Sequence, residues 1–221
     1  MKKYAVSLAA VLLATVSVVL AQDTFTTDQI LAKLDEKAKV FKSLQAEVEH
    51  QKLTLGRLTV PDKGTFVMEP SKAAPKAMWD ITTPTPMRRL LDDGNARQYN
   101  VGDNVYQDFK FDPKSERLAY LMLGFGTPAA TIKKGYKAEA KGRETLKSVN
   151  TVVLELTSLN QAEEISAIRL WMDPQTWTPV QTRIFQGERV YDDFRYSKVQ
   201  LNKSVPGSAF DLKMKPGAKK Q

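Results

Sequence analysis

The chain has 221 residues, with 33 lysines and arginines against 25 aspartates and glutamates, which gives a formal net charge of +8. It contains no cysteine and one histidine, His50. These counts exclude disulfide bonds and thiolate ligands and remove most zinc-site and catalytic-triad chemistry, so stability must come from a buried core.

The first 21 residues have the features of a secretory signal peptide. Two lysines are followed by an apolar run, and Val19-Leu20-Ala21 is a small-residue cleavage site. Ser and Thr interrupt the run, which is shorter than a spanning helix needs. The alternative is an uncleaved N-terminal anchor. We expect cleavage after Ala21 and a single exported domain over residues 22–221, for which a nucleic-acid partner is a poor fit.

The mature chain is predicted to begin with one amphipathic helix. Thr26 and Gln29 form a capping-box pattern. Apolar residues then recur at helical spacing at Ile30, Leu31, Leu34, Ala38 and Phe41. From Leu44 to Gln51 the spacing changes to two, which predicts a half-buried strand. His50 ends its apolar side, and we interpret it as a hydrogen-bonded edge histidine and not as a catalytic base.

Short strands punctuated by Pro and Asp-Gly turns are predicted after this point. The first group covers residues 64–68, 77–81, 87–91, 97–101 and 104–109. One or two short helices follow between residues 115 and 126, ended by Gly124 and Gly126. The second group covers 151–159, 166–176, 179–187 and 189–199, with a final strand over 209–217 that has Phe210 and Leu212 on one face.

Two neighbouring predicted strands have apolar side chains on both faces. In residues 64–68, Phe66 and Met68 lie on one face of the strand and Val67 lies on the other. In residues 77–81, Trp79 lies on one face and Met78 on the other. Such strands are either buried on both sides or offer a surface to an apolar ligand. Local motifs for catalysis are absent, because Asp192 and Asp193, for example, are adjacent on a strand and point to opposite faces. We therefore expect no enzyme activity, no catalytic residue, no metal site and no cofactor.

At these strands the sequence resembles the LolA family of periplasmic lipoprotein carriers. The matching elements are Gly64-Thr65-Phe66, Glu69-Pro70, Trp79-Asp80-Ile81 with Pro84, Leu90-Leu91, Asp93-Gly94 and Tyr99. Two downstream stretches, residues 167–185 and 194–217, also match, so the resemblance covers nearly the whole mature chain.

The resemblance implies an α+β, mainly β fold: an incomplete antiparallel β-barrel with an N-terminal helix and a short central helix over an apolar cavity. With strand alternation, it indicates a cavity lining of Phe66, Met68, Trp79, Leu90 and Met172. The expected lid residues are Ile30, Leu34, Leu121 and Phe125. Glu69 stands where the family has a basic residue that ties the lid to the barrel, so a different latch is expected here, with Lys72 or Arg89 as partner.

The implied function is a periplasmic chaperone that carries acylated lipoproteins or lipid from the inner to the outer membrane. The implied partners are an inner-membrane releasing transporter and an outer-membrane acceptor, and the carrier is expected to be a monomer. One alternative is a lipid-binding or envelope-stress sensor that acts through a membrane partner. A weaker one is an exported enzyme with a lipidic substrate.

Overall fold

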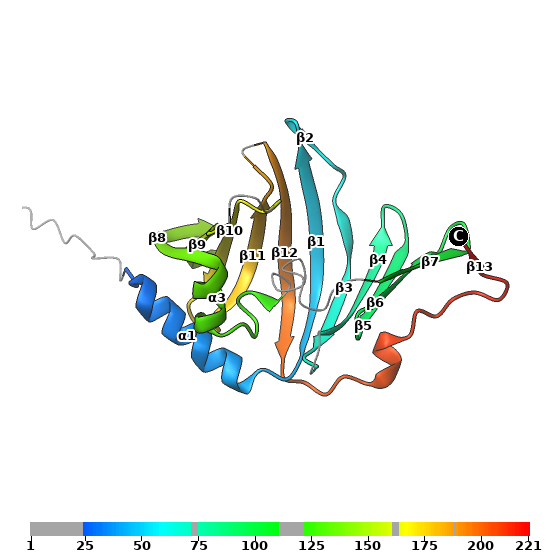
Figure 1. Cartoon of the computed structure of the whole chain (residues 1–221), viewed down its shortest axis with the longest axis horizontal. Helices are drawn as coiled ribbons and strands as arrows, with labels where there is room; N and C mark the ends of the chain where they lie inside the picture. Colours follow the sequence, from blue (N-terminus) through cyan, green and yellow to red (C-terminus); the bar gives the residue numbers. More distant parts are fainter. Residues whose placement is uncertain (1–23, 72–74, 111–121, 161–163, 188) are drawn as a thin grey trace, which may run out of the picture.

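The computed structural model describes residues 24–71, 75–110, 122–160, 164–187 and 189–221. The predicted signal peptide and Leu121 lie outside these ranges. Figure 1 shows one strongly curved sheet with helix α1 at one end. Among the described helices, none is long and apolar enough to cross a membrane.

The described chain forms two α-helices, a 3₁₀ helix and a 13-stranded sheet. The helices are α1 (Thr27–Val40), α3 (Ala129–Gly135) and the 3₁₀ helix η1 (Gly207–Phe210). The strands are β1 (Leu44–Thr54), β2 (Arg57–Leu58), β3 (Asp62–Glu69), β4 (Lys76–Thr83), β5 (Met87–Asp92), β6 (Asn95–Asn100), β7 (Val105–Lys110), β8 (Tyr136–Leu146), β9 (Val149–Ser158), β10 (Ala167–Asp173), β11 (Thr178–Phe185), β12 (Val190–Leu201) and β13 (Lys219–Lys220).

The sheet is open and almost entirely antiparallel. Its order is β13-β7-β6-β5-β4-β3-β1-β12-β11-β10-β9-β8, with β2 paired to β1 and only the β13–β7 pair parallel. The two end strands do not pair with each other, so the sheet curves without closing. The predicted incomplete barrel, mainly β with an N-terminal helix, is confirmed. The short central helix predicted between residues 115 and 126 lies mostly outside the described residues.

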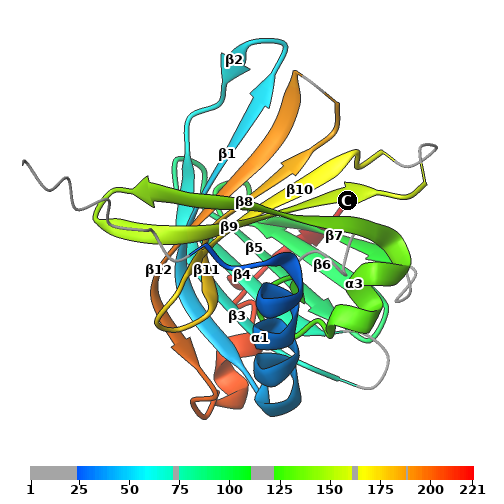
Figure 2. The same cartoon turned by 90° about the vertical axis from the view of Figure 1, so that its left-hand side faces the viewer.

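Helix α1 begins and ends as its sequence predicts. The Gln29 amide donates to Thr26 Oγ1 at 3.2 Å, and Gln29 Oε1 accepts from the Thr26 amide at 2.8 Å, which completes the capping box. The buried stripe of α1 is Ile30, Leu31 and Leu34. Asp35 accepts the amide hydrogen of Ala129 at 2.6 Å, so α1 also fixes the start of α3, which lies beside it in Figure 2.

The concave face of the sheet holds two apolar clusters. In one, α1 and α3 pack against Leu154, Leu156, Ile168, Leu170 and Met172 of β9 and β10. In the other, Leu44, Ala46, Phe66, Met68 and Leu91 pack against Phe125. Leu123 belongs to the first cluster and Phe125 to the second, so the segment at residues 122–126 joins them.

The convex face of β4–β6 is covered by the C-terminal segment. Phe210 and Leu212 pack on Met78 and Tyr99, with Leu90 at the margin of this third cluster. The strand predicted over 209–217 is therefore wrong: residues 207–210 form a 3₁₀ helix and the following residues are irregular. Phe210 and Leu212 do face the same way, because both are drawn onto one apolar surface. Burial of that surface explains the apolar residues on both sides of β3 and β4.

Two of the longer elements were not predicted, α3 and β8, and neither were the two-residue strands β2 and β13. The α3 segment follows Pro128 and has few apolar residues, and its burial on α1 comes from Ala129 and Ile132. Strand β8 alternates Ala138 and Ala140 with charged residues, a pattern without the bulky apolar side chains that mark a strand.

Gly64 lies where β3 and β4 approach too closely for a side chain. A Cβ at this position would meet the carbonyl oxygen of Asp80 at 2.0 Å. We expect Gly64→Ala to lower the free energy of unfolding by about 1–3 kcal/mol, because backbone must shift to accept the methyl group. Urea unfolding measures this, with Gly135→Ala as the control, since a Cβ there meets no atom within 4 Å. Equal stability of the two variants would contradict the prediction.

Candidate ligand-binding cavity

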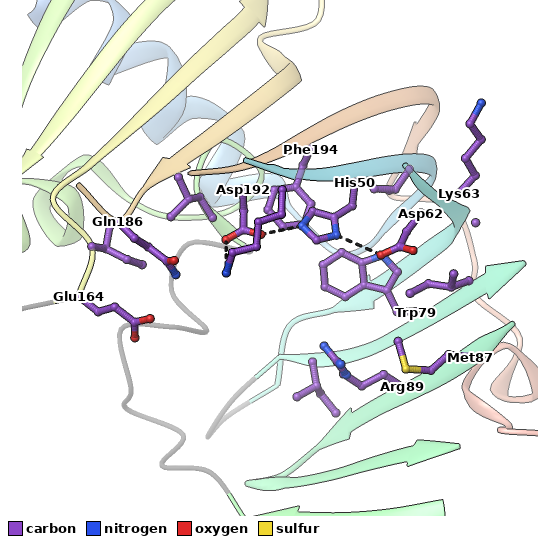
Figure 3. A pocket seen from close by; sticks show the side chains of 17 residues that line it. His50, Asp62, Lys63, Trp79, Met87, Arg89, Glu164, Gln186, Asp192 and Phe194 are labelled. Carbon is purple, nitrogen blue, oxygen red and sulfur yellow. Dashed lines mark hydrogen bonds and ion pairs between the residues drawn. The ribbon is translucent and has the colours of Figure 1, made fainter. Parts of the chain in front are cut away.

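A cavity of about 520 Å³ opens on the concave side of the sheet, beyond the second apolar cluster. Strands β1, β3, β4, β5, β11 and β12 form its walls, and Glu164 and Ile165 approach from the segment before β10 (Figure 3). The lining residues are Val48, His50, Lys52, Asp62, Lys63, Gly64, Trp79, Ile81, Met87, Arg89, Leu91, Glu164, Ile165, Ile184, Gln186, Asp192 and Phe194.

Polarity changes along β1 and β3, two neighbouring strands that cross the cavity. On β1 the concave positions read Leu44, Ala46, Val48, His50 and Lys52. On β3 they read Met68, Phe66, Gly64 and Asp62, in the opposite chain direction. Leu44 lies opposite Met68 and His50 lies opposite Asp62, so the apolar ends and the polar ends of these antiparallel strands coincide. On these two strands the concave surface is therefore apolar at one end and charged at the other, whereas β4 stays apolar through Trp79 and Ile81.

His50 is the centre of the polar end. Its Nε2 lies 2.8 Å from Asp192 Oδ1 and its Nδ1 lies 3.5 Å from Asp62 Oδ2, as the dashed lines in Figure 3 mark. The imidazole also stacks on Phe194, with ring centroids 4.5 Å apart. The predicted hydrogen-bonded histidine is confirmed, but its edge position is wrong, because β1 lies between β3 and β12 within the sheet.

Arg89 brings a second charge into the cavity. Its Nε donates to Gln98 Oε1 at 3.1 Å, and no ion pair to it is found among the described residues. Its side chain reaches solvent within a concavity, where surrounding protein atoms desolvate the guanidinium. This desolvation lowers the pKa of Arg89, and the charge of Asp62 opposes the shift. A guanidinium in such surroundings can donate to a carboxylate or phosphate.

Of the five residues predicted to line the cavity, the structure places Trp79 in its wall. Phe66 and Met68 are 2% and 0% exposed and lie in the apolar cluster next to it, where the Phe66 ring centroid is 4.7 Å from that of Trp79. Met172 is fully buried below α1 in the other cluster. Leu90 lies on the convex face, and its neighbour Leu91 lines the cavity, because successive residues of β5 alternate between faces.

Three of the predicted lid residues, Ile30, Leu34 and Phe125, are buried and are not among the residues that line the cavity, and Leu121 lies outside the described ranges. Ile30 and Leu34 pack against β9–β11, and Phe125 contacts Tyr196 edge-on at a centroid distance of 5.2 Å. Glu69 follows Met68 on β3 and so points to the convex face, whereas Arg89 points into the cavity. The predicted Glu69–Arg89 pair is therefore wrong, and Lys72 lies outside the described residues.

The polar residues that line the cavity were not predicted from the sequence. His50, Asp62, Arg89 and Asp192 come from four strands, and none forms a local motif with another. One signal was available: His50 and Lys52 continue the apolar alternation of β1 with charged groups, which marks the end of the apolar surface. Among the described residues, no cluster of His, Asp and Glu is arranged to hold a metal ion.

No protein-family model matches the sequence, and a comparison with curated proteins finds no match. Solved structures do resemble it. An uncharacterized conserved protein from Thermus thermophilus has a TM-score of 0.54 at 11% identity, over 88% of this chain and 98% of that chain. The LolA superfamily protein NE2245 from Nitrosomonas europaea has a TM-score of 0.39 at 16% identity, over 85% and 98% of the two chains. MucB of Pseudomonas aeruginosa, in its complex with MucA, has a TM-score of 0.47 at 14% identity, over 84% of this chain and 60% of that chain.

Identities of this size show the fold alone. The Thermus protein shares it over nearly the full length of both chains. The open, helix-flanked sheet is the fold that the sequence resemblance implied. This chain spans 60% of the length of MucB.

Proposed function

We propose that this protein is a carrier that binds an acyl chain in the concave cavity and holds the attached polar group at the charged end. The observation that carries the proposal is the change from apolar to charged side chains along β1 and β3, since an amphiphile has the same two ends. The cavity volume of about 520 Å³ is within the range of small-molecule sites. The proposal assigns no catalytic residue.

Hydrocarbon burial supplies the affinity in this proposal. Each methylene removed from water contributes about 0.8 kcal/mol, so a soluble carrier needs an apolar wall and little else. Trp79, Ile81 and Leu91 provide that wall, with the flexible side chain of Met87 at its margin. The headgroup would meet the His50–Asp192 pair, which offers a charged donor and acceptor. Arg89, which lies beside Trp79 in the wall, offers a further donor to an anionic group.

A charge on the apolar wall should abolish acyl binding. Ile81 is only partly buried, so Ile81→Glu can reach solvent and keep the fold, unlike a charge at fully buried Met68. We expect this variant to bind a fluorescent fatty acid at least tenfold more weakly, because a carboxylate in the wall must be desolvated by the acyl chain. Thr82→Glu is the control, since Thr82 is exposed and follows Ile81 on the other face of β4. Undiminished binding by Ile81→Glu would refute the site.

The same titration can be followed through the tryptophans. Trp79 lines the cavity, whereas Trp171 donates to Glu144 at 2.7 Å on the opposite face. Trp79→Phe should remove the ligand-dependent change in tryptophan emission and Trp171→Phe should keep it. Mass spectrometry of lipids and acylated proteins that co-purify with the protein identifies the cargo.

The proposal extends to a periplasmic shuttle for acylated lipoproteins or lipid, with a membrane-bound donor and acceptor. A shuttle should accelerate the transfer of a labelled acyl ligand between donor and acceptor vesicles. A sensor that uses the same cavity would bind the ligand without accelerating transfer.

A further inference from the structure

The hairpin formed by β1 and β2 carries an apolar tip that no part of the described chain covers. Leu55, Leu58 and Val60 are 77%, 55% and 70% exposed, and they fall within six consecutive residues. Among the described residues, the four other exposed large apolar side chains are 37–60% exposed, and they are scattered through the chain at Val40, Phe109, Leu159 and Met214. In Figure 1 the hairpin stands at the upper limit of the sheet.

The turn at this tip uses a residue that its backbone disfavours. Thr54 pairs with Arg57, which leaves Leu55 and Gly56 as a two-residue turn with φ of 50° and 83°. Asn-Gly is the usual sequence for such a turn, and leucine is strained in the left-handed region. Leu55 thus combines a strained backbone with a side chain that is 77% exposed. Neither the turn nor the packing of the protein explains a leucine here.

The tip is held in position by hydrogen bonds from the strands below it. Thr59 donates its amide hydrogen to the Lys52 carbonyl at 2.8 Å, and its Oγ1 accepts from the Lys52 amide at 2.9 Å. The Leu55 amide donates to the carbonyl of Arg189 at 3.2 Å, which links the tip to the turn before β12. The three apolar side chains therefore project from a fixed scaffold.

Basic residues lie around the tip, and one of them, Lys52, has an acidic neighbour, since its Nζ lies 3.9 Å from Asp192 Oδ2. Residues 51–61 contain Lys52 and Arg57 and no acidic residue, and exposed Arg189 lies beside the turn. The polar end of the cavity is built on the same two strands, through His50 and Lys52 of β1 and Asp62 of β3. An apolar tip with basic residues at its base therefore stands next to the end of the cavity where a headgroup would lie.

We propose that this hairpin is a membrane contact, which inserts Leu55, Leu58 and Val60 into the interface of an anionic lipid bilayer. Apolar side chains flanked by Lys and Arg bind such interfaces through hydrocarbon burial and attraction to acidic headgroups. A protein partner fits less well, because stable interfaces bury about 800 Å² on each side, which three side chains on a narrow turn do not supply. Contact at this place would bring the charged end of the cavity to the membrane surface.

The test uses Leu55→Asn combined with Leu58→Ser and Val60→Ser. Because Asn-Gly suits the turn, the variant should fold at least as well as the parent, which urea unfolding checks. Sedimentation with vesicles of phosphatidylglycerol and phosphatidylcholine is expected to show at least tenfold weaker binding by the variant. Leu159→Asn is the matched control, since Leu159 is 60% exposed but lies beside Gly135 at the end of α3. It should bind vesicles like the parent.

A single label locates the contact. The sequence has no cysteine, so Leu55→Cys and Leu159→Cys each accept one environment-sensitive dye. The emission of the dye at position 55 should shift to the blue and become more intense when the anionic vesicles are added. The emission of the dye at position 159 should not change. The proposal is overturned if the parent does not bind these vesicles, if both dyes respond alike, or if the hairpin variant loses a protein contact or self-association while vesicle binding persists. Fatty-acid binding in solution tests the cavity independently and should be the same in parent and hairpin variant.

Discussion

Replacement of Asp193 by alanine is expected to lower the free energy of unfolding by about 2–4 kcal/mol, because it removes a buried carboxylate that accepts hydrogen bonds from an amide and from a guanidinium group. Asp193 is 2% exposed. Its Oδ1 accepts from Gln181 Nε2 at 2.8 Å and from Arg183 Nε at 2.9 Å, and Arg195 Nη2 lies 3.1 Å from Oδ2 in an ion-pair contact without hydrogen-bond geometry. The variant would leave the two guanidinium groups without their shared carboxylate.

The neighbouring residue provides the control. Asp192 lies on the opposite face, where its Oδ1 is 2.8 Å from His50 Nε2 in a more open site. Asp192→Ala should cost only about 1 kcal/mol, the usual net value of one hydrogen bond. Urea unfolding of both variants measures the difference. A loss in Asp193→Ala no greater than in Asp192→Ala would show that the buried carboxylate contributes little to stability.

Phe125→Ala is expected to destabilise the protein by about 3–5 kcal/mol, because the ring fills the concave side of the sheet and is 2% exposed. The chain fits around it closely: a Cβ at Gly124 would meet Pro179 Cγ at 2.4 Å, and one at Gly126 would meet the Phe41 ring at 2.7 Å. Phe125 therefore behaves as part of the core in this structure.

Thermal and urea unfolding check this prediction, with Phe109→Ala as the control, since that ring is 46% exposed. The two variants also test the lid role predicted for Phe125. A ring that leaves its site when ligand binds would show little loss of stability in ligand-bound Phe125→Ala, and a core ring would show the full loss with and without ligand.

Alternation and turn residues were sufficient to predict most of the sheet. Strands β3 to β7 fall within a few residues of their expected positions, because Pro and Asp-Gly turns separate clear two-residue patterns. Strand β8 was missed because alanines and charges hide its alternation. Its burial depends on α1, whose Thr27 Oγ1 accepts the Ala140 amide hydrogen at 2.9 Å.

The candidate site was less accessible to sequence reasoning. Strand alternation sorts residues into two faces and does not say which one is concave, so it favours Leu90 as readily as Leu91, which lines the cavity. It also does not show how far a concave residue lies from the opening, so fully buried Met68 was grouped with Trp79. Both distinctions depend on the curvature of the sheet and on the C-terminal segment packed behind β4–β6.

The position of β1 in the middle of the sheet has a consequence for how the chain folds. Its two long neighbours are β3, which follows within a few residues, and β12, which is the last long strand of the sequence. The pairing of Leu44 with Leu201 therefore closes a loop that contains nearly all of the sheet. Closing so long a loop is slow and precedes any gain from the contacts it makes. During synthesis from the N-terminus, the two halves of the sheet cannot be joined until β12 has emerged, so the joined sheet forms only on a nearly complete chain.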